Sequence, residues 1–199
     1  MTPDMLRRIR LILWALVALA ALVATAIFFL APPKSPSALG GGDYRVMDPQ
    51  GNTLDASMFK GHPSLLFFGY THCPDVCPTT LAEMASWFEA LGDEGKNLRG
   101  YFVTVDPERD PPEVLANYVS AVTDRVTPIS GNPAEVMKLA DAWKVAIEKV
   151  PGGEGGEYTM NHTASVFLIN KDGGFEGTIA YGENADTAIE KIRKLLAKG

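Results

Sequence analysis

Residues 65–78 read LLFFGYTHCPDVCP, and this stretch decides how the chain folds. The uncharged run at 65–69 has the length and apolar character of a central strand buried on both faces. Pro78 suits the first turn of a helix, so a buried strand passes here into a helix. The only two cysteines, Cys73 and Cys77, lie at that junction. They predict a reactive site, because a structural disulfide closing so small a loop would gain little stability.

Strand and helix patterns alternate around this stretch. Strands are expected at 44–47, 53–54, 64–69, 101–105, 126–129, 164–170 and 175–181, and helices at 78–91, 111–122, 133–143 and 185–198. Alternating elements predict an α/β sandwich, and the closing strand–turn–strand unit makes its central sheet mixed. A strand followed by two cysteines at a helix start is typical of the thioredoxin-like version of that architecture.

The N-terminal part predicts a membrane anchor. Residues 11–30 carry no charge, and twenty apolar residues match a hydrocarbon core of roughly 30 Å. Three arginines precede them, which predicts a cytoplasmic segment at 1–10, a transmembrane helix at 11–30, and export of the remainder of the chain. Residues 31–42 are rich in Pro, Ser and Gly and predict a linker, so the folded domain is expected at 43–199.

A cleaved signal peptide is the alternative for this segment. Its apolar run is longer than the usual signal-peptide core, and residues 24–26 form only a weak cleavage site. Both interpretations export the domain. The expected location is the inner membrane, with a single pass and a periplasmic C-terminal domain.

Charge narrows the class of partner. The chain carries a net charge of −6, and residues 31–199 carry −8, from 15 basic and 23 acidic residues. An acidic surface argues against binding the phosphates of nucleic acid.

The cysteine spacing allows redox chemistry, metal binding, or both. Residues four apart share one helix face, so both sulfurs can face one volume, and a helix N-terminus is expected to lower a thiol pKa. Thioredoxin-type enzymes place two residues between their cysteines, whereas this chain places three. His162, just before the strand at 164–170, is a candidate third ligand; the alternative is a surface-loop histidine. Two thiolates and an imidazole suit Cu(I) and also Zn(II).

Three motifs together resemble the Sco/SenC family. They are GYTHCPDVCP at 69–78, VDPERD at 105–110 and His162-Thr163, in an order that covers most of the chain from residue 43 onward. The resemblance implies a thioredoxin-like fold and a copper site, for Cu(I) and also Cu(II), with Cys73, Cys77 and His162 as ligands. Many members have an acidic residue before this histidine, where the chain has Asn161, so the control of imidazole orientation is expected to differ.

The resemblance implies a membrane-anchored copper chaperone that serves the dinuclear copper centre of cytochrome c oxidase. Its expected partners are the copper-receiving oxidase subunit and a thiol reductant protein. The alternative is an enzyme, a thiol–disulfide oxidoreductase that reduces cysteines of that subunit with Cys73 and Cys77. A peroxiredoxin fits less well, because Pro74 occupies the position where that family needs a hydroxyl residue.

Three further residues have two interpretations each. Asp75 could assist Cu(II) binding or partner contact, or could complement a helix N-terminus. Asp106 could belong to the site or simply form a turn before Pro107. His72 is next to Cys73, but neighbouring side chains point different ways.

Overall fold

The computed structural model describes residues 3–30, 39–152 and 157–198. The chain divides into two units, residues 1–37 and 38–199, each considered by itself. Most of the predicted linker at 31–42, and residues 153–156 of a glycine-rich stretch, lie outside the described residues.

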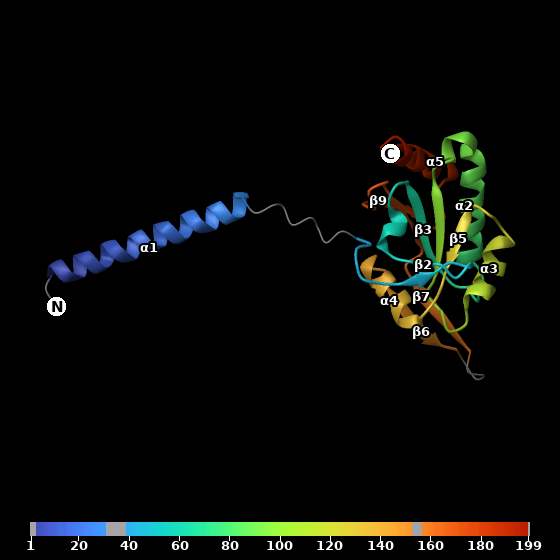
Figure 1. Ribbon diagram of the computed structural model, residues 1–199, viewed down its shortest axis with the longest axis horizontal. Helices are drawn as coiled ribbons and strands as arrows, with labels where there is room; N and C mark the ends of the chain where they lie inside the picture. The colour runs from blue at the N-terminus through green and yellow to red at the C-terminus, as the bar shows by residue number, and fades with distance from the viewer. Residues whose placement is uncertain (1–2, 31–38, 153–156, 199) are drawn as a thin grey trace. The chain divides into compact units, whose positions relative to one another are not determined.

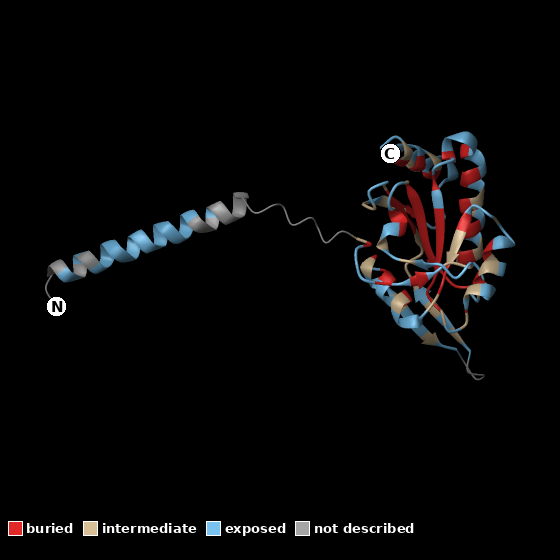
Figure 2. Ribbon diagram, in the orientation of Figure 1, coloured by how far each residue is buried: buried red, intermediate tan, exposed pale blue. Residues whose placement is uncertain are grey.

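The first unit contains helix α1, Pro3–Leu30, which includes the predicted anchor at 11–30. Much of this helix is exposed (Figure 2), and its exposed large apolar residues include Leu11 and Trp14. Within the described residues, no helix is both long enough and apolar enough to count as a membrane span. Residues 11–30 are therefore helical as predicted, and membrane crossing stays a prediction.

The second unit is built on a five-stranded sheet in the order β5-β4-β3-β8-β9 (Figure 1). Its strands are β3 Ser64–Gly69, β4 Arg99–Thr104, β5 Val126–Ile129, β8 Ser165–Ile169 and β9 Phe175–Ala180. β3, β4 and β5 run parallel, while β8 pairs antiparallel with β3 and β9 antiparallel with β8. The predicted mixed sheet is confirmed.

Helices cover both faces of this sheet. They are α2 Val76–Leu91, α3 Pro112–Ser120, α4 Pro133–Ala142 and α5 Ala185–Leu196, with short 3-10 turns at Ala56–Phe59 (η1) and Gly92–Gly95 (η2). α2 and α3 each join neighbouring parallel strands in the same direction, and right-handed crossovers then place both on one face. α5 packs beside α2, and α4 covers the other face (Figure 1).

Strand β3 forms the centre of the core. Every one of its six residues is buried, as its continuous apolar run predicts (Figure 2). It pairs with β4 along its whole length, from Ser64 to Gly69. Its pairing with β8 covers only Ser64 to Leu66, so β8 does not accompany β3 to its carboxyl end.

Two hairpins form small sheets of their own. The predicted leading hairpin is confirmed as β1 Val46–Met47 with β2 Thr53–Leu54. A second hairpin, β6 Ile147–Pro151 with β7 Tyr158–His162, was not predicted from the sequence. His162, expected in a loop, is the last residue of β7. Neither strand of this hairpin contains a fully buried residue, which explains why no continuous apolar run marked it.

Candidate metal site

The structure brings together two predicted ligands that lie 85 residues apart. Cys77 is in the first turn of α2 and is buried, while His162 ends β7 and is partly buried. The Nε2 atom of His162 lies 3.5 Å from the Sγ atom of Cys77. A thiol and an imidazole thus face each other beside the carboxyl end of β3.

Aromatic rings fix the place of the imidazole. The rings of Phe67 and Tyr70 meet it edge-on, with centroids 6.2 and 6.0 Å away. The Met160 N–H also donates to the Tyr70 hydroxyl oxygen at 3.3 Å. The segment that leads from β3 to the cysteines therefore contacts β7 directly.

Cys73 lies in the loop three residues before α2 begins, so the expectation that it shares one helix face with Cys77 is wrong. It is a free thiol of intermediate exposure, whereas Cys77 is a free and buried one. The Cys73 Sγ atom accepts a hydrogen bond from the Cys77 N–H at 3.3 Å. One sulfur is thus accessible from solvent, and the other is enclosed by protein.

Gly69, the last residue of β3, leaves space for the inner thiol. A Cβ atom placed on it would lie 3.2 Å from Cys77 Sγ and 2.7 Å from the Phe102 ring. Real Cβ atoms essentially never approach a ring carbon that closely. Glycine is therefore required here for the close approach of the α2 thiol to the strand.

Burial shifts the pKa values of the Cys77 thiol and the His162 imidazole, and each shift favours the uncharged form. It raises the pKa of the Cys77 thiol, and the hydrogen bond with Cys73 raises this pKa further. The sequence predicted a lowered thiol pKa from the helix N-terminus, and that prediction is wrong for Cys77 because desolvation outweighs the helix dipole. Burial also lowers the pKa of His162, which favours the neutral imidazole at pH 7.

The tautomer of His162 follows from its other contact. Its Nδ1 atom lies 3.1 Å from the carbonyl oxygen of Thr163. A carbonyl can only accept, so Nδ1 carries the proton and Nε2 keeps its lone pair toward Cys77. A backbone carbonyl thus orients the imidazole.

The described residues contain no group of three or more His, Cys, Asp or Glu side chains arranged to hold a metal ion. The Cys77–His162 pair is in place, and Cys73 lies beside it through its bond to the Cys77 amide. The donors fit a soft metal ion by chemical type, since thiolate and imidazole are its preferred ligands. The third predicted ligand, Cys73, is thus adjacent to this pair without forming a three-residue group with it among the described residues.

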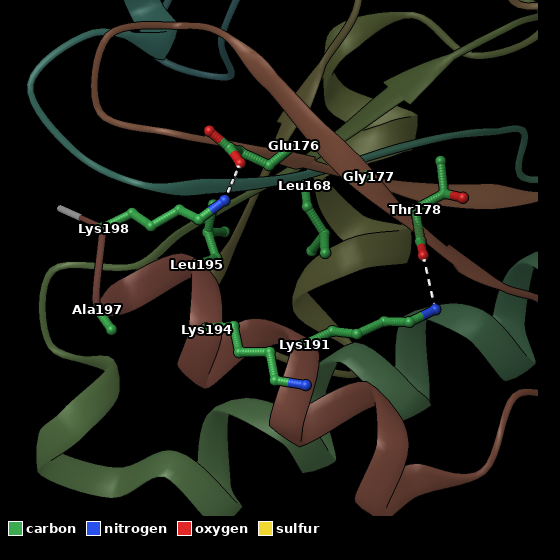
Figure 3. Close-up of a pocket in the computed structure, with 9 residues that line it drawn as sticks. All are labelled: Leu168, Glu176, Gly177, Thr178, Lys191, Lys194, Leu195, Ala197 and Lys198. Carbon is green, nitrogen blue, oxygen red and sulfur yellow. Dashed lines mark hydrogen bonds and ion pairs between the residues drawn. The ribbon is translucent and has the colours of Figure 1, made fainter.

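A hollow of about 410 Å³ lies elsewhere, between β9 and the end of α5 (Figure 3). It is lined by Leu168, Glu176, Gly177, Thr178, Lys191, Lys194, Leu195, Ala197 and Lys198. Lys198 pairs with Glu176 at 2.6 Å, and Lys191 donates to the Thr178 carbonyl at 3.0 Å. This lining offers no thiol or imidazole, so it is not the predicted metal site.

Asp110 holds the cysteine loop through hydrogen bonds to Thr71. Its buried carboxylate accepts from the Thr71 N–H at 3.0 Å, the Thr71 hydroxyl at 2.5 Å and the Thr104 hydroxyl at 2.7 Å. The sequence motif contained Asp110, but no role was predicted for it. Its position at the end of a short turn after β4 is the signal that could have indicated one.

The three remaining candidate residues, Asp106, Asp75 and His72, have positions and contacts typical of structural roles. Asp106 accepts hydrogen bonds from Arg109 and from the Tyr158 hydroxyl, which makes it a turn residue in an ion pair. Asp75 is the N-cap of α2, although no capping bond from its carboxylate occurs among the described residues. His72 has a half-exposed side chain and contacts the Thr71 hydroxyl at 3.0 Å.

Comparisons with known proteins agree on one family. The family model described as SCO1/SenC matches residues 32–197. The protein named "Protein SCO2 homolog, mitochondrial" from Danio rerio is 34% identical over 158 residues, covering 78% of this chain and 57% of the relative. The chain spans less than two thirds of the length of the first curated relatives that it matches.

Solved structures show the same fold. Bradyrhizobium japonicum ScoI with copper bound is 37% identical, with a TM-score of 0.71 over 78% of this chain and 98% of that one. Yeast Sco1 with copper bound is 27% identical, with a TM-score of 0.74 over 81% and 90%. BsSco, described as a member of the Sco family of cytochrome c oxidase assembly proteins, is 24% identical, with a TM-score of 0.63 over 83% and 98%, and supports the fold alone. The thioredoxin-like fold is confirmed.

Proposed function

The chain belongs to the SCO1/SenC family, and on that premise we propose that it is a copper chaperone for cytochrome c oxidase assembly. Copper is its cargo, bound by Cys73, Cys77 and His162. The observation that carries the proposal is the 3.5 Å approach of His162 Nε2 to Cys77 Sγ. Two relatives with copper bound have the same fold and support the choice of metal.

The donor chemistry supports Cu(I) in particular. Two thiolates and one neutral imidazole form a soft set, and soft ligands select Cu(I). Each thiol must lose its proton to bind, so copper uptake releases protons. His162 releases none at pH 7, because its lowered pKa keeps it neutral.

The unequal burial of the cysteines suggests an order of events in copper transfer. Cys73 is partly exposed, so an incoming ligand from the oxidase subunit would displace it first. Cys77 is buried and would hold the ion, together with His162, until that exchange is under way. The ion then passes by ligand exchange without being released to water.

Anaerobic titration of the reduced chain with Cu(I), against a competing chelator, tests the proposal. We expect one equivalent to bind, and His162→Ala to weaken binding. His62→Ala is the matched control, because His62 contacts Ser64 at the opposite end of β3. Failure to bind one equivalent, or equal binding by the His162 and His62 variants, would contradict the assignment.

A thiol–disulfide oxidoreductase is the second candidate, supported by a partly exposed thiol beside a buried one. The Cys73 thiolate would attack a substrate disulfide, form a mixed disulfide and release one substrate thiolate. Cys77 would then lose its proton, attack Cys73 Sγ and release the second substrate thiol. Two electrons pass to the substrate, and a thiol reductant protein must reduce the Cys73–Cys77 disulfide again.

Trapping of a mixed disulfide distinguishes the oxidoreductase activity from copper delivery. Cys77→Ser should accumulate a mixed disulfide with an oxidised peptide of the copper-receiving subunit, whereas Cys73→Ser should not. Turnover that does not change in His162→Ala would favour the enzyme over the chaperone. No mixed disulfide with either variant would contradict the enzymatic role.

We also propose that residues 11–30 anchor the chain in the inner membrane, with the domain on the periplasmic side. The uncharged stretch and the preceding arginines support this orientation. An oxidising compartment would require the thiol reductant partner. The full chain should resist alkaline extraction from membranes, and extraction of the intact chain by alkali would contradict anchoring. Protease added to spheroplasts should cleave the domain if it lies on the periplasmic side.

A further inference from the structure

Residues 106–110, the turn after β4, contact both segments that supply the proposed ligands. The Asp110 N–H donates to the Asp106 carbonyl at 2.9 Å, and the Arg109 N–H donates to the same oxygen at 3.1 Å. These bonds close the turn on itself. Asp106, Glu108 and Arg109 contact the β6–β7 hairpin, and Asp110, the last residue of the turn, contacts the cysteine loop.

Arg109 joins the turn to β7. Its guanidinium carbon lies 3.6 Å from the centre of the Tyr158 ring, and its Nη1 donates to the Tyr158 carbonyl at 3.0 Å. Its Nε donates to Asp106, and the Tyr158 hydroxyl donates to the same carboxylate at 2.8 Å. Arg109 and Asp106 thus hold both the backbone and the ring of Tyr158.

A second contact joins the turn to β6. The Lys149 ammonium lies 3.2 Å from the Glu108 carboxylate and 3.8 Å from the centre of the Tyr158 ring. This pair is exposed and adds little by itself. It places a side chain of each hairpin strand on the same turn.

Asp110 joins the turn to the cysteine loop. Its carboxylate accepts both the N–H and the hydroxyl of Thr71, two residues before Cys73. This carboxylate is fully buried, and the Thr104 hydroxyl donates a further hydrogen bond to it. The loop that leads into α2 is therefore fixed to the same five residues that hold the hairpin.

The hairpin depends on such attachments. Among the described residues, β6 and β7 pair only with each other and add no strand to the central sheet. Its position relative to α2 is consequently set by side chains rather than by a shared ladder of hydrogen bonds. His162, at the end of β7, therefore depends on these contacts for the position of its strand, in addition to the Phe67 and Tyr70 rings that its imidazole meets.

We propose that the turn at 106–110 sets the spacing between Cys77 and His162, with Arg109 as its main positioning residue. The inference rests on the proposed copper function and adds a residue that touches no metal. Arg109 acts through His162, because it holds the strand that carries the imidazole. Partners that orient a metal ligand typically change affinity by about 10- to 100-fold when removed.

A double-mutant cycle tests this role. We expect Arg109→Ala to lower Cu(I) affinity about tenfold in the otherwise native chain, and to have no further effect in a His162→Ala background. Arg125→Ala is the matched control, because Arg125 also lies over an aromatic ring, Phe88, and donates to a backbone carbonyl. An equal loss with and without His162, or no loss in the native background, would overturn the proposal.

A second variant guards against misfolding. Tyr158→Phe keeps the ring and removes only the hydroxyl that donates to Asp106. Both Arg109→Ala and Tyr158→Phe should speed amide hydrogen exchange across 158–162 in the metal-free protein, whereas Arg125→Ala should not. Because this measurement needs no copper, unchanged hydrogen exchange in both variants overturns the positioning role alone. A native chain that takes up no Cu(I) overturns the proposed copper function instead.

Discussion

Replacing Gly69 with alanine should disturb the site and the core together. The added Cβ would lie 2.7 Å from the Phe102 ring, 3.0 Å from the Phe67 ring and 3.2 Å from Cys77 Sγ. Both rings are fully buried, so neither can move away without displacing other core side chains. Adding a methyl group to a well-packed core costs about 1–3 kcal/mol. At about 2–4 °C per kcal/mol for a domain of this size, the melting temperature should fall by several degrees.

The control for this change is Gly100→Ala. Gly100 lies on the neighbouring strand β4, and its added Cβ would be equally crowded, at 2.8 Å from Val126 and 3.1 Å from Phe88. Denaturant unfolding should show a comparable loss of stability for both variants. Only Gly69→Ala should weaken Cu(I) binding, because only that Cβ meets the Cys77 sulfur. Native stability and native copper affinity in Gly69→Ala would refute the packing described around the inner thiol.

Three further results are expected. The free energy of unfolding of the metal-free protein should fall above about pH 8.5, because folding raises the pKa of Cys77, and this fall should be absent in Cys77→Ser. It should also fall below about pH 6.5, because folding lowers the pKa of His162, and this fall should be absent in His162→Gln. Denaturation measured across this pH range checks both effects. Asp110→Ala should destabilise the protein by about 2–4 kcal/mol in urea unfolding, because it leaves three donors without an acceptor; a change below about 1 kcal/mol would contradict that network. Ile192→Ala should cost about 2–5 kcal/mol by the same method, since Ile192 is fully buried on α5, whereas the exposed neighbour Lys194→Ala should leave stability unchanged.

The parts of the fold predicted from sequence are those with strong local signals. The uncharged run at 64–69 predicted β3 to the residue, because a strand buried on both faces leaves a continuous apolar pattern. Prolines and glycine placed the helix boundaries within about two residues; α2, for example, begins at Val76 rather than Pro78. The strand expected at 164–170 is confirmed as β8, which pairs with β3, and His162, three residues before it, lies beside Cys77.

The parts that were missed depend on contacts between distant residues. The β6–β7 hairpin has no fully buried residue, so neither strand shows a run that periodicity could detect. The raised pKa of Cys77 results from its burial, which the motif around it does not reveal. The role of Arg109 depends on Tyr158, 49 residues later in the chain, and no local pattern links the two.

Because the β3–β8 ladder ends early, β3 and β8 are not paired with each other at the end of the sheet near Cys77 and His162. Parallel pairing continues to Gly69 on one side, while antiparallel pairing stops at Leu66 on the other. Beyond Leu66, the cysteine loop and the strand that carries His162 are therefore joined by side-chain contacts rather than by a β-ladder. A relative with a longer or shorter hairpin could thus hold the residue at the His162 position elsewhere while keeping the same pairing of the central strands.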